Sequence, residues 1–135
     1  MARIKSSATP TDELDRDVAA VVASIRRLTK HLEAEPDIAI RAASVLLKVG
    51  PYAAGPIAAA LGRSRSPQRK VLMIRLLSHL GQQARTTVER ALLEVLKSEK
   101  DPVVRQHAWA ANAALIVRDF QGTDAGGPAR GERGV

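Results

Sequence analysis

Nine residues at positions 62–70, GRSRSPQRK, carry four positive charges between two apolar segments. Guanidinium and ammonium groups, serine hydroxyls and a helix N-terminus can all bind phosphate or carboxylate oxygens. Pro67 is typical of a first helical turn, which would place Arg69 and Lys70 on that turn. Cations there oppose the helix dipole unless an anion is bound. The stretch, with Arg63 and Arg65, is therefore either an anion contact or an ordinary solvated loop.

The positive charge of the chain is concentrated in its middle third. The 135 residues have a formal net charge of +7 at pH 7, yet residues 1–37 sum to −1 and residues 89–135 to zero. Residues 38–88 contain no Asp or Glu, and such a one-sided field favours an anionic partner. The cations of this segment are Arg41, Lys48, Arg63, Arg65, Arg69, Lys70, Arg75 and Arg85.

Chemistry beyond charge recognition has few residues to carry it. The absence of cysteine excludes disulfides, thiolate metal ligands and cysteine nucleophiles. The middle third offers no carboxylate for a metal or for acid–base work, and no nucleophile elbow, P-loop or dinucleotide fingerprint occurs. We therefore expect no enzymatic activity, no metal and no cofactor.

The elements that would position the cations are helices. Residues 11–34 predict a long amphipathic helix, because its apolar residues alternate spacings of four and three. Thr9-Pro10 or Thr11 can cap its start. Such a helix buries only one face, so it suits the end of a stack. Its apolar stripe comprises Leu14, Val18, Val21, Ile25, Leu28 and Leu32.

Three later segments align when their prolines are superposed: PDIAIRAASVLLKVG from Pro36, PQRKVLMIRLLSHLG from Pro67 and PVVRQHAWAANAALI from Pro102. Each predicts a helix that begins at its proline, and Gly50 and Gly81 are expected to end the first two. The predicted core positions are Ile38, Ala42, Val45, Leu46 and Val49, then Met73, Leu76, Leu77 and Leu80, then Val104, Ala108, Ala111 and Leu115.

Each of these helices follows another helical candidate, at residues 11–34, 51–62 and 82–98. The sequence therefore predicts an all-α fold of three antiparallel helix pairs stacked as a short α-solenoid. Residues 1–8 are expected to form a flexible arm, residues 9–118 the repeat domain, and residues 119–135, rich in glycine, a disordered tail.

The segment DPVVRQHAWAANAAL resembles the second helix of a HEAT repeat, whose common form is Asp-Pro-x-Val-Arg-x-x-Ala-x-x-Ala-Leu. Asn112 departs from the usual leucine, and the two earlier copies are more degenerate, with Glu35 and Ser66 for Asp, and Ala39 and Lys70 for Arg. The resemblance covers about residues 11–118 and implies a right-handed solenoid whose second helices line a concave face. The matching residues are Asp101, Pro102, Val104, Arg105, Ala108 and Ala111.

On that concave face the resemblance places a basic groove. The outward positions would be Arg41, Ser44 and Lys48, then Leu72, Arg75 and His79, then His107, Ala110 and Ala114. We expect Arg41, Lys48, Arg75 and His79 to bind a partner in the groove. Arg63, Arg65, Arg69 and Lys70 would lie at its edge.

The expected function is a non-enzymatic scaffold that binds an acidic protein segment. Sequence-independent nucleic-acid binding through the same residues is the alternative, and an ordinary charged helix surface explains any single cation equally well.

Single-strand binding usually needs aromatic platforms, and the three aromatics are scattered, with Tyr52 and Trp109 predicted to fill gaps in an alanine-rich core. The His-Glu dipeptides of HEAT-like hydroxylases are absent, because Leu, Leu and Ala follow His31, His79 and His107.

The ends of the chain give the remaining expectations. The last helix lacks a covering repeat, so self-association or a partner is predicted at its apolar residues. No secretory signal and no run of roughly 18 apolar residues is visible, so a cytoplasmic protein without membrane contact is expected. The apolar residues of the last helix are Val103, Val104, Trp109, Leu115, Ile116, Val117 and Phe120.

Overall fold

The computed structural model describes the backbone of residues 9–126 and the side chains of residues 9–118. The described chain is all-helical, which confirms the predicted class. The predicted arm, residues 1–8, and the end of the predicted tail, residues 127–135, lie outside the described residues. The elements are α2 (Pro10–His31), α3 (Pro36–Val49), the 3-10 helix η1 (Gly50–Ala53), α4 (Ala54–Arg63), α5 (Pro67–Leu80), α6 (Arg85–Ser98) and α7 (Pro102–Gly126).

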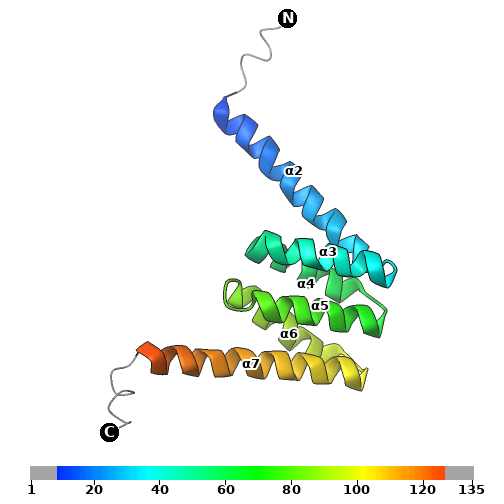
Figure 1. Cartoon of the computed structure of the whole chain (residues 1–135), viewed down its shortest axis with the longest axis vertical. Coiled ribbons are helices and arrows are strands. Elements are labelled where there is room, and N and C mark those ends of the chain that lie inside the picture. Colours follow the sequence, from blue (N-terminus) through cyan, green and yellow to red (C-terminus); the bar gives the residue numbers. More distant parts are fainter. Residues whose placement is uncertain (1–8, 127–135) are drawn as a thin grey trace, which may run out of the picture.

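The helices form two layers (Figure 1). Helices α3, α5 and α7 lie side by side and run in the same direction, with α4 and α6 behind them. Contacts join α2 to α3, α4 to α5 and α6 to α7. The two helices of each of these three pairs therefore pack against one another. Further contacts join α2, α4 and α6 in one layer and α3, α5 and α7 in the other.

Local capping explains why the helices start where they do. Thr9 and Asp12 form a reciprocal capping box at α2, in which each backbone N–H donates to the other's side-chain oxygen at 3.1 Å. At α5 the Ser66 hydroxyl accepts from the Arg69 N–H at 3.3 Å. A proline then occupies the first turn of α2, α3 and α5, where its missing N–H costs nothing.

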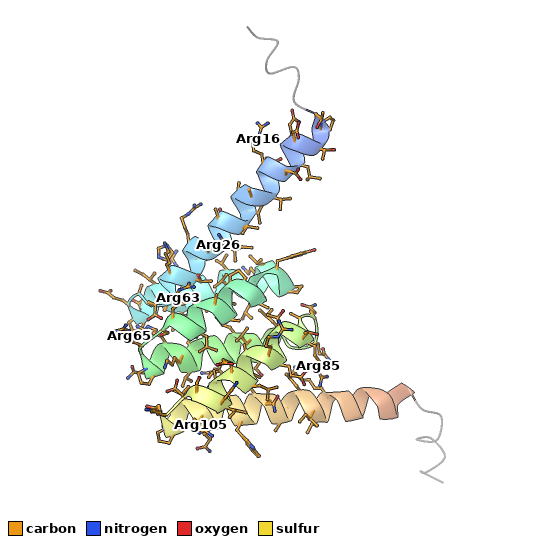
Figure 2. All side chains as sticks on the ribbon, turned by 180° about the vertical axis from the view of Figure 1, so that it is seen from behind. Arg16, Arg26, Arg63, Arg65, Arg85 and Arg105 are labelled. Carbon is orange, nitrogen blue, oxygen red and sulfur yellow. The ribbon has the colours of Figure 1, made fainter. Side chains whose placement is uncertain are left out.

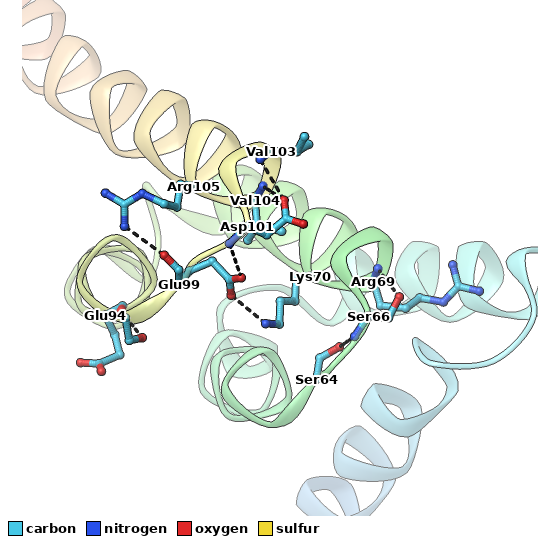
Figure 3. Close-up of polar contacts among 11 residues, drawn as sticks. Ser64, Ser66, Arg69, Lys70, Glu94, Glu99, Asp101, Val103, Val104 and Arg105 are labelled. Carbon is cyan, nitrogen blue, oxygen red and sulfur yellow. Dashed lines mark hydrogen bonds and ion pairs between the residues drawn. The ribbon is translucent and has the colours of Figure 1, made fainter.

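Three residues around Pro102, namely Asp101, Val104 and Arg105, each have a structural role. Asp101 Oδ1 accepts from the N–H groups of Val103 and Val104 at 2.9 and 3.1 Å, which caps α7. Val104 is fully buried. The Arg105 guanidinium donates to the carbonyl oxygens of Leu96 and Glu99, which ties α7 to the end of α6. Figure 3 shows the contact with Glu99.

Helix α7 continues to Gly126, beyond residue 118, after which a disordered tail was predicted. The prediction relied on glycine content. No proline lies between Pro102 and Pro128, so nothing in this stretch prevents backbone hydrogen bonding from continuing the helix.

Most predicted core positions are buried. Every predicted core residue of α5 and α7 is buried, including Met73 and Leu77, which are fully buried. In α3, Ala42 and Leu46 are buried, but the prediction is wrong for Ile38 and Val45, which are 45% and 44% exposed. The reason is the path of α2, which diverges from α3 and leaves that edge of α3 uncovered (Figure 1).

Only the C-terminal half of the apolar stripe of α2 is buried. Ile25 and Leu32, near its C-terminal end, are buried in the core. Leu14, Val18 and Val21 are 60%, 51% and 57% exposed, because the N-terminal half of α2 extends beyond the other helices (Figure 1). This half of the helix has an apolar face with nothing against it among the described residues.

The aromatic prediction is wrong. Tyr52 is 80% exposed and Trp109 is 65% exposed, so neither fills the core. The alanines beside them fill the core instead. Ala53, which follows Tyr52, and Ala108, which precedes Trp109, are fully buried. Their small side chains let the helices approach closely and leave no gap for an aromatic ring. The Phe120 side chain lies outside the described residues.

The two glycines that end helices act differently. Gly50 has φ of 84° and ψ of −146°, a conformation that only glycine adopts readily. Gly81 has an ordinary φ of −59°, so it does not end α5 through a left-handed turn. It is needed for space, since a Cβ built on it would overlap Leu115 Cδ2 of α7.

By length and composition, residues 36–63 contain one stretch apolar enough to cross a membrane, with a mean hydropathy of 1.3. About a third of the relevant window, 33%, is buried inside the fold. The stretch is not one straight helix, because the chain turns at Gly50 and continues as α4 behind α3 (Figure 1).

Candidate functional site

The candidate site is the outer face of α3 and α5. Four residues that were predicted to bind a partner are exposed there. They are Arg41 and Lys48 on α3 and Arg75 and His79 on α5. The buried residues of α3 are Ala39, Ala42, Ala43 and Leu46, and those of α5 are Met73, Ile74, Leu76, Leu77 and Leu80. The four basic residues therefore lie on the faces turned away from the core.

The edges of α3 and α5 that face one another can be assigned from contacts. The Arg69 guanidinium donates to the Ala34 carbonyl oxygen at 2.5 Å, so the Arg69 edge of α5 points toward the start of α3. Leu72 and His79 follow on that same edge at helical spacing. His79 therefore borders α3, whereas Arg75 lies on the adjoining outer face of α5.

The opposite edge of α3 faces α2, because Ile38 and Val45 line a groove with Leu28. Ile40 and Leu47 lie on the other edge of α3, toward α5, since α3 lies between these two helices (Figure 1). Ile40 is 62% exposed and Leu47 is 37% exposed. We use the name α3–α5 groove for the outer surface of these two helices, with the basic residues Arg41, Lys48, Arg75 and His79 and the apolar residues Ile40, Leu47 and Leu72. Arg41 also lines the groove between α2 and α3.

The α3–α5 groove has an uncompensated positive charge. Among residues 9–118, no carboxylate forms an ion pair with Arg41, Lys48 or Arg75. Asp37, one turn before Arg41, is the only acidic residue on either helix. The groove can therefore attract an anionic partner by long-range electrostatics and offer it apolar contacts as well.

Two cations of the opening stretch are used inside the fold. Arg69 holds the Ala34 carbonyl oxygen, and Lys70 Nζ lies 2.7 Å from Glu99 Oε1. The hydrogen bond from Lys70 lowers the pKa of the Glu99 carboxyl despite its partial burial, and the Asp101 N–H donates to the same carboxylate. Both cations thus connect helices, and the charge of Lys70 is compensated (Figure 3).

Arg63 and Arg65 lie in a different place from Arg41 and Arg75. They line a groove with Thr29, Lys30 and Glu33 of the α2 end and with Ala60 of α4. Figure 2, which views the molecule from the α4 side, shows both arginines near the junction of α2 and α4. Arg63, at the end of α4, and Arg65, in the loop that follows, are therefore associated with the α2–α4 layer and not with the α3–α5 groove.

A groove of 550 Å³ between α4 and α6 was missed in the sequence. One wall consists of small residues at helical spacing, and the other carries Arg90 and Glu94. The spacing of the small residues is visible in the sequence and could have indicated this groove. A stripe of small residues on a helix equally indicates close packing against another helix, however. The small residues are Gly55, Ala58, Ala59 and Gly62.

The C-terminal end of the stack has exposed apolar residues, as the sequence indicated. Trp109, Ile116 and Val117 are 65%, 47% and 50% exposed, while Val104 and Leu115 are buried. Within residues 9–118, no three His, Asp or Glu side chains gather closely enough to bind a metal ion.

No family model, curated protein or solved structure matches this chain, so the resemblance to HEAT repeats rests on the residues quoted above.

Proposed function

We propose that the chain is a non-enzymatic scaffold, a short right-handed HEAT-like α-solenoid that binds an acidic segment of another protein. The pairwise order of helix contacts supports the solenoid, since each hairpin packs on the next in both layers. The binding surface is the α3–α5 groove, and the expected location is the cytoplasm.

The observation that carries this proposal is the pairing of apolar and basic residues on α3. Ile40 and Leu47 are seven residues apart, and Arg41 and Lys48 follow each of them directly. Two turns of helix therefore present an exposed apolar line beside a basic line. An amphipathic segment with acidic residues along one side of its apolar face complements both lines at once.

Sequence-independent nucleic-acid binding is the second candidate. The absence of Asp and Glu from residues 38–88 favours it, because clustered cations alone suffice for phosphate contacts. The exposed Ile40 and Leu47 favour a protein partner, since a phosphate backbone gains nothing from aliphatic side chains. Tyr52 and Trp109 are exposed but lie on η1 and α7, so they do not form a stacking platform in the groove.

Two fluorescent probes of equal length separate the candidates: an acidic amphipathic peptide and a single-stranded oligonucleotide. We expect the peptide to bind the wild-type chain and to lose at least about tenfold in affinity with Arg41→Glu/Arg75→Glu. Ile40→Ser should weaken the peptide and leave the oligonucleotide unchanged. The matched control is Arg90→Glu/Lys97→Glu, which makes the same change of net charge on the exposed side of α6.

Unchanged peptide binding by Arg41→Glu/Arg75→Glu would refute the α3–α5 groove as the site. Tight oligonucleotide binding that falls steeply with salt and is insensitive to Ile40→Ser would support the second candidate instead. Circular dichroism of each variant should match the wild type, since all the altered side chains are exposed.

A further inference from the structure

The N-terminal half of α2 presents an apolar face that no described part of the chain covers. Leu14, Val18 and Val21 continue the stripe that Ile25 and Leu32 bury in the core. Their alternating spacing of three and four residues is that of a helix–helix seam. A surface of this kind is unusual on a helix that needs no partner.

A receiving surface for such a face lies between α2 and α3. Where these helices diverge, they enclose a groove of 250 Å³ with Leu28 on α2 and Ile38 and Val45 on α3. The same groove contains Arg41 and His31 at its margin. Its lining is therefore both apolar and basic. Figure 1 shows the N-terminal half of α2 projecting away from α3.

The charges of α2 are divided along its length. The N-terminal part carries four carboxylates and one arginine, and no acidic residue occurs between positions 18 and 32. The C-terminal part carries Arg26, Arg27 and Lys30. The four carboxylates belong to Asp12, Glu13, Asp15 and Asp17.

We propose that two copies of this chain pair through α2 in an antiparallel, two-fold arrangement centred near Val21. The N-terminal half of each α2 occupies the α2–α3 groove of the other copy, and Leu14 enters between Leu28, Ile38 and Val45. The four N-terminal carboxylates of each copy then lie against the basic C-terminal half of the other copy's α2 and against its Arg41. The occupant is a second copy because this chain itself carries the complementary helix.

The antiparallel direction follows from the charges. A parallel pair would bring the two acidic ends together and the two basic ends together, which is unfavourable. An antiparallel pair makes the same acid–base contact twice and also aligns the helix dipoles favourably. The α2–α3 groove shares Arg41 with the α3–α5 groove, but Lys48, Arg75 and His79 do not line it, and it is separate from the exposed C-terminal end.

The mass of the full chain in solution tests the pairing. We expect a species of twice 14.5 kDa by light scattering, reduced to the single-chain mass by Val18→Gln. Leu93→Gln is the matched control, because Leu93 on α6 is equally exposed, at 51%, and should leave the dimer intact. Arg75→Glu, on α5, should also leave the mass unchanged, which separates this interface from the α3–α5 groove.

Engineered cysteines test the direction, since the chain contains no cysteine of its own. Val21→Cys, near the two-fold axis, should form a disulfide-linked dimer under mild oxidation. Leu14→Cys alone should not, whereas Leu14→Cys combined with Val45→Cys should cross-link between copies. Arg26→Glu/Arg27→Glu should raise the dissociation constant about tenfold, and adding Asp15→Lys/Asp17→Lys should restore it.

A monomer at every concentration would overturn the proposal. So would a dimer that survives Val18→Gln and is dissociated by Ile116→Lys, because association would then use the C-terminal end. Efficient cross-linking of Leu14→Cys alone would refute the antiparallel arrangement. Capture of an unrelated helix by the α2–α3 groove, with the chain itself monomeric, would replace the second copy by a foreign partner.

Discussion

Lys70 Nζ lies 2.7 Å from Glu99 Oε1, and this ion pair joins the first turn of α5 to the segment between α6 and α7 (Figure 3). Both side chains are largely shielded from solvent, with 20% and 14% of their surfaces exposed. The Glu99 carboxylate also accepts from the Asp101 N–H at 3.1 Å. One carboxylate therefore organises the contact between the second and third hairpins.

Replacing Glu99 should make the chain less stable in a pH-dependent way. The pKa of Glu99 is lowered from 4.5, mainly by the hydrogen bond from Lys70, so the ionised form favours the folded state. The stabilisation is present above pH 4.5 and is lost as the pH falls through the lowered value. We expect Glu99→Gln to cost about 1 kcal/mol at neutral pH, measured by urea unfolding.

The difference between wild type and Glu99→Gln should shrink as the pH is lowered below 4.5, where the wild-type carboxylate becomes protonated. Glu94→Gln is the control, because the Glu94 side chain is exposed on α6. Its unfolding free energy should stay close to that of the wild type across the same range. A Glu99→Gln deficit that persists unchanged in acid would exclude the ion pair as its cause.

Asp101→Ala should destabilise the start of α7. Asp101 Oδ1 satisfies two N–H groups that otherwise have no helical partner, at Val103 and Val104. Loss of this cap should cost about 1 kcal/mol of unfolding free energy. Asp101→Asn retains the acceptor oxygen and should lose much less. Equal losses for the two variants would show that the carboxylate charge, and not capping, is what the site requires.

Gly81→Ala should destabilise the contact between α5 and α7. The added methyl would overlap Leu115 Cδ2, and it would also lie 3.3 Å from the Ser78 carbonyl oxygen. Leu115 is buried, with 2% of its surface exposed, so it has little room to move. We expect a loss of roughly 1–3 kcal/mol in thermal or urea unfolding.

The control for this substitution is Gly62→Ala, since nothing beyond its chain neighbours and its own helix backbone lies within 4 Å of a Cβ built there and its backbone is helical. That variant should be neutral or slightly stabilising, because alanine is the better helix former. Leu115→Val should recover part of the loss when combined with Gly81→Ala. If the double variant is no better than the sum of the two losses, the overlap is not the cause.

The sequence predicted the helices well because their signals are local. Thr9, Ser66 and Asp101 accept hydrogen bonds from the first turns that they precede, and a proline follows each of them. The core of α5 and α7 also follows from spacing alone, since both helices are covered on the same face along their length.

The candidate site depended on contacts that spacing cannot supply. Lys70 and Glu99 are 29 residues apart, and Arg69 reaches Ala34 across 35 residues, so neither partner was visible in the sequence. The exposure of Ile38 and Val45 depends on the angle at which α2 leaves α3, which is a tertiary property. Arg63 and Arg65 were predicted at the edge of the groove, but they line a different groove beside the end of α2, which is likewise a tertiary property.

Trp109 provides the last prediction, because it is the single tryptophan of the chain and is 65% exposed. Its fluorescence should resemble that of a solvated indole and should be quenched readily by iodide. If association uses α2, the emission should not change when a concentrated sample is diluted, since Trp109 lies on α7. The reference is Tyr52→Trp/Trp109→Phe, which moves the indole to a position that is 80% exposed in the wild type.

Burial of Trp109 with rising concentration would give a blue shift and protection from iodide, because the indole would leave water. If Ile116→Lys abolished that shift, the association would use the C-terminal end, where Ile116 is 47% exposed. Measuring the mass of Val18→Gln and Ile116→Lys on the same samples assigns the surface. The variant that dissociates the dimer identifies which end of the helical stack the second copy covers.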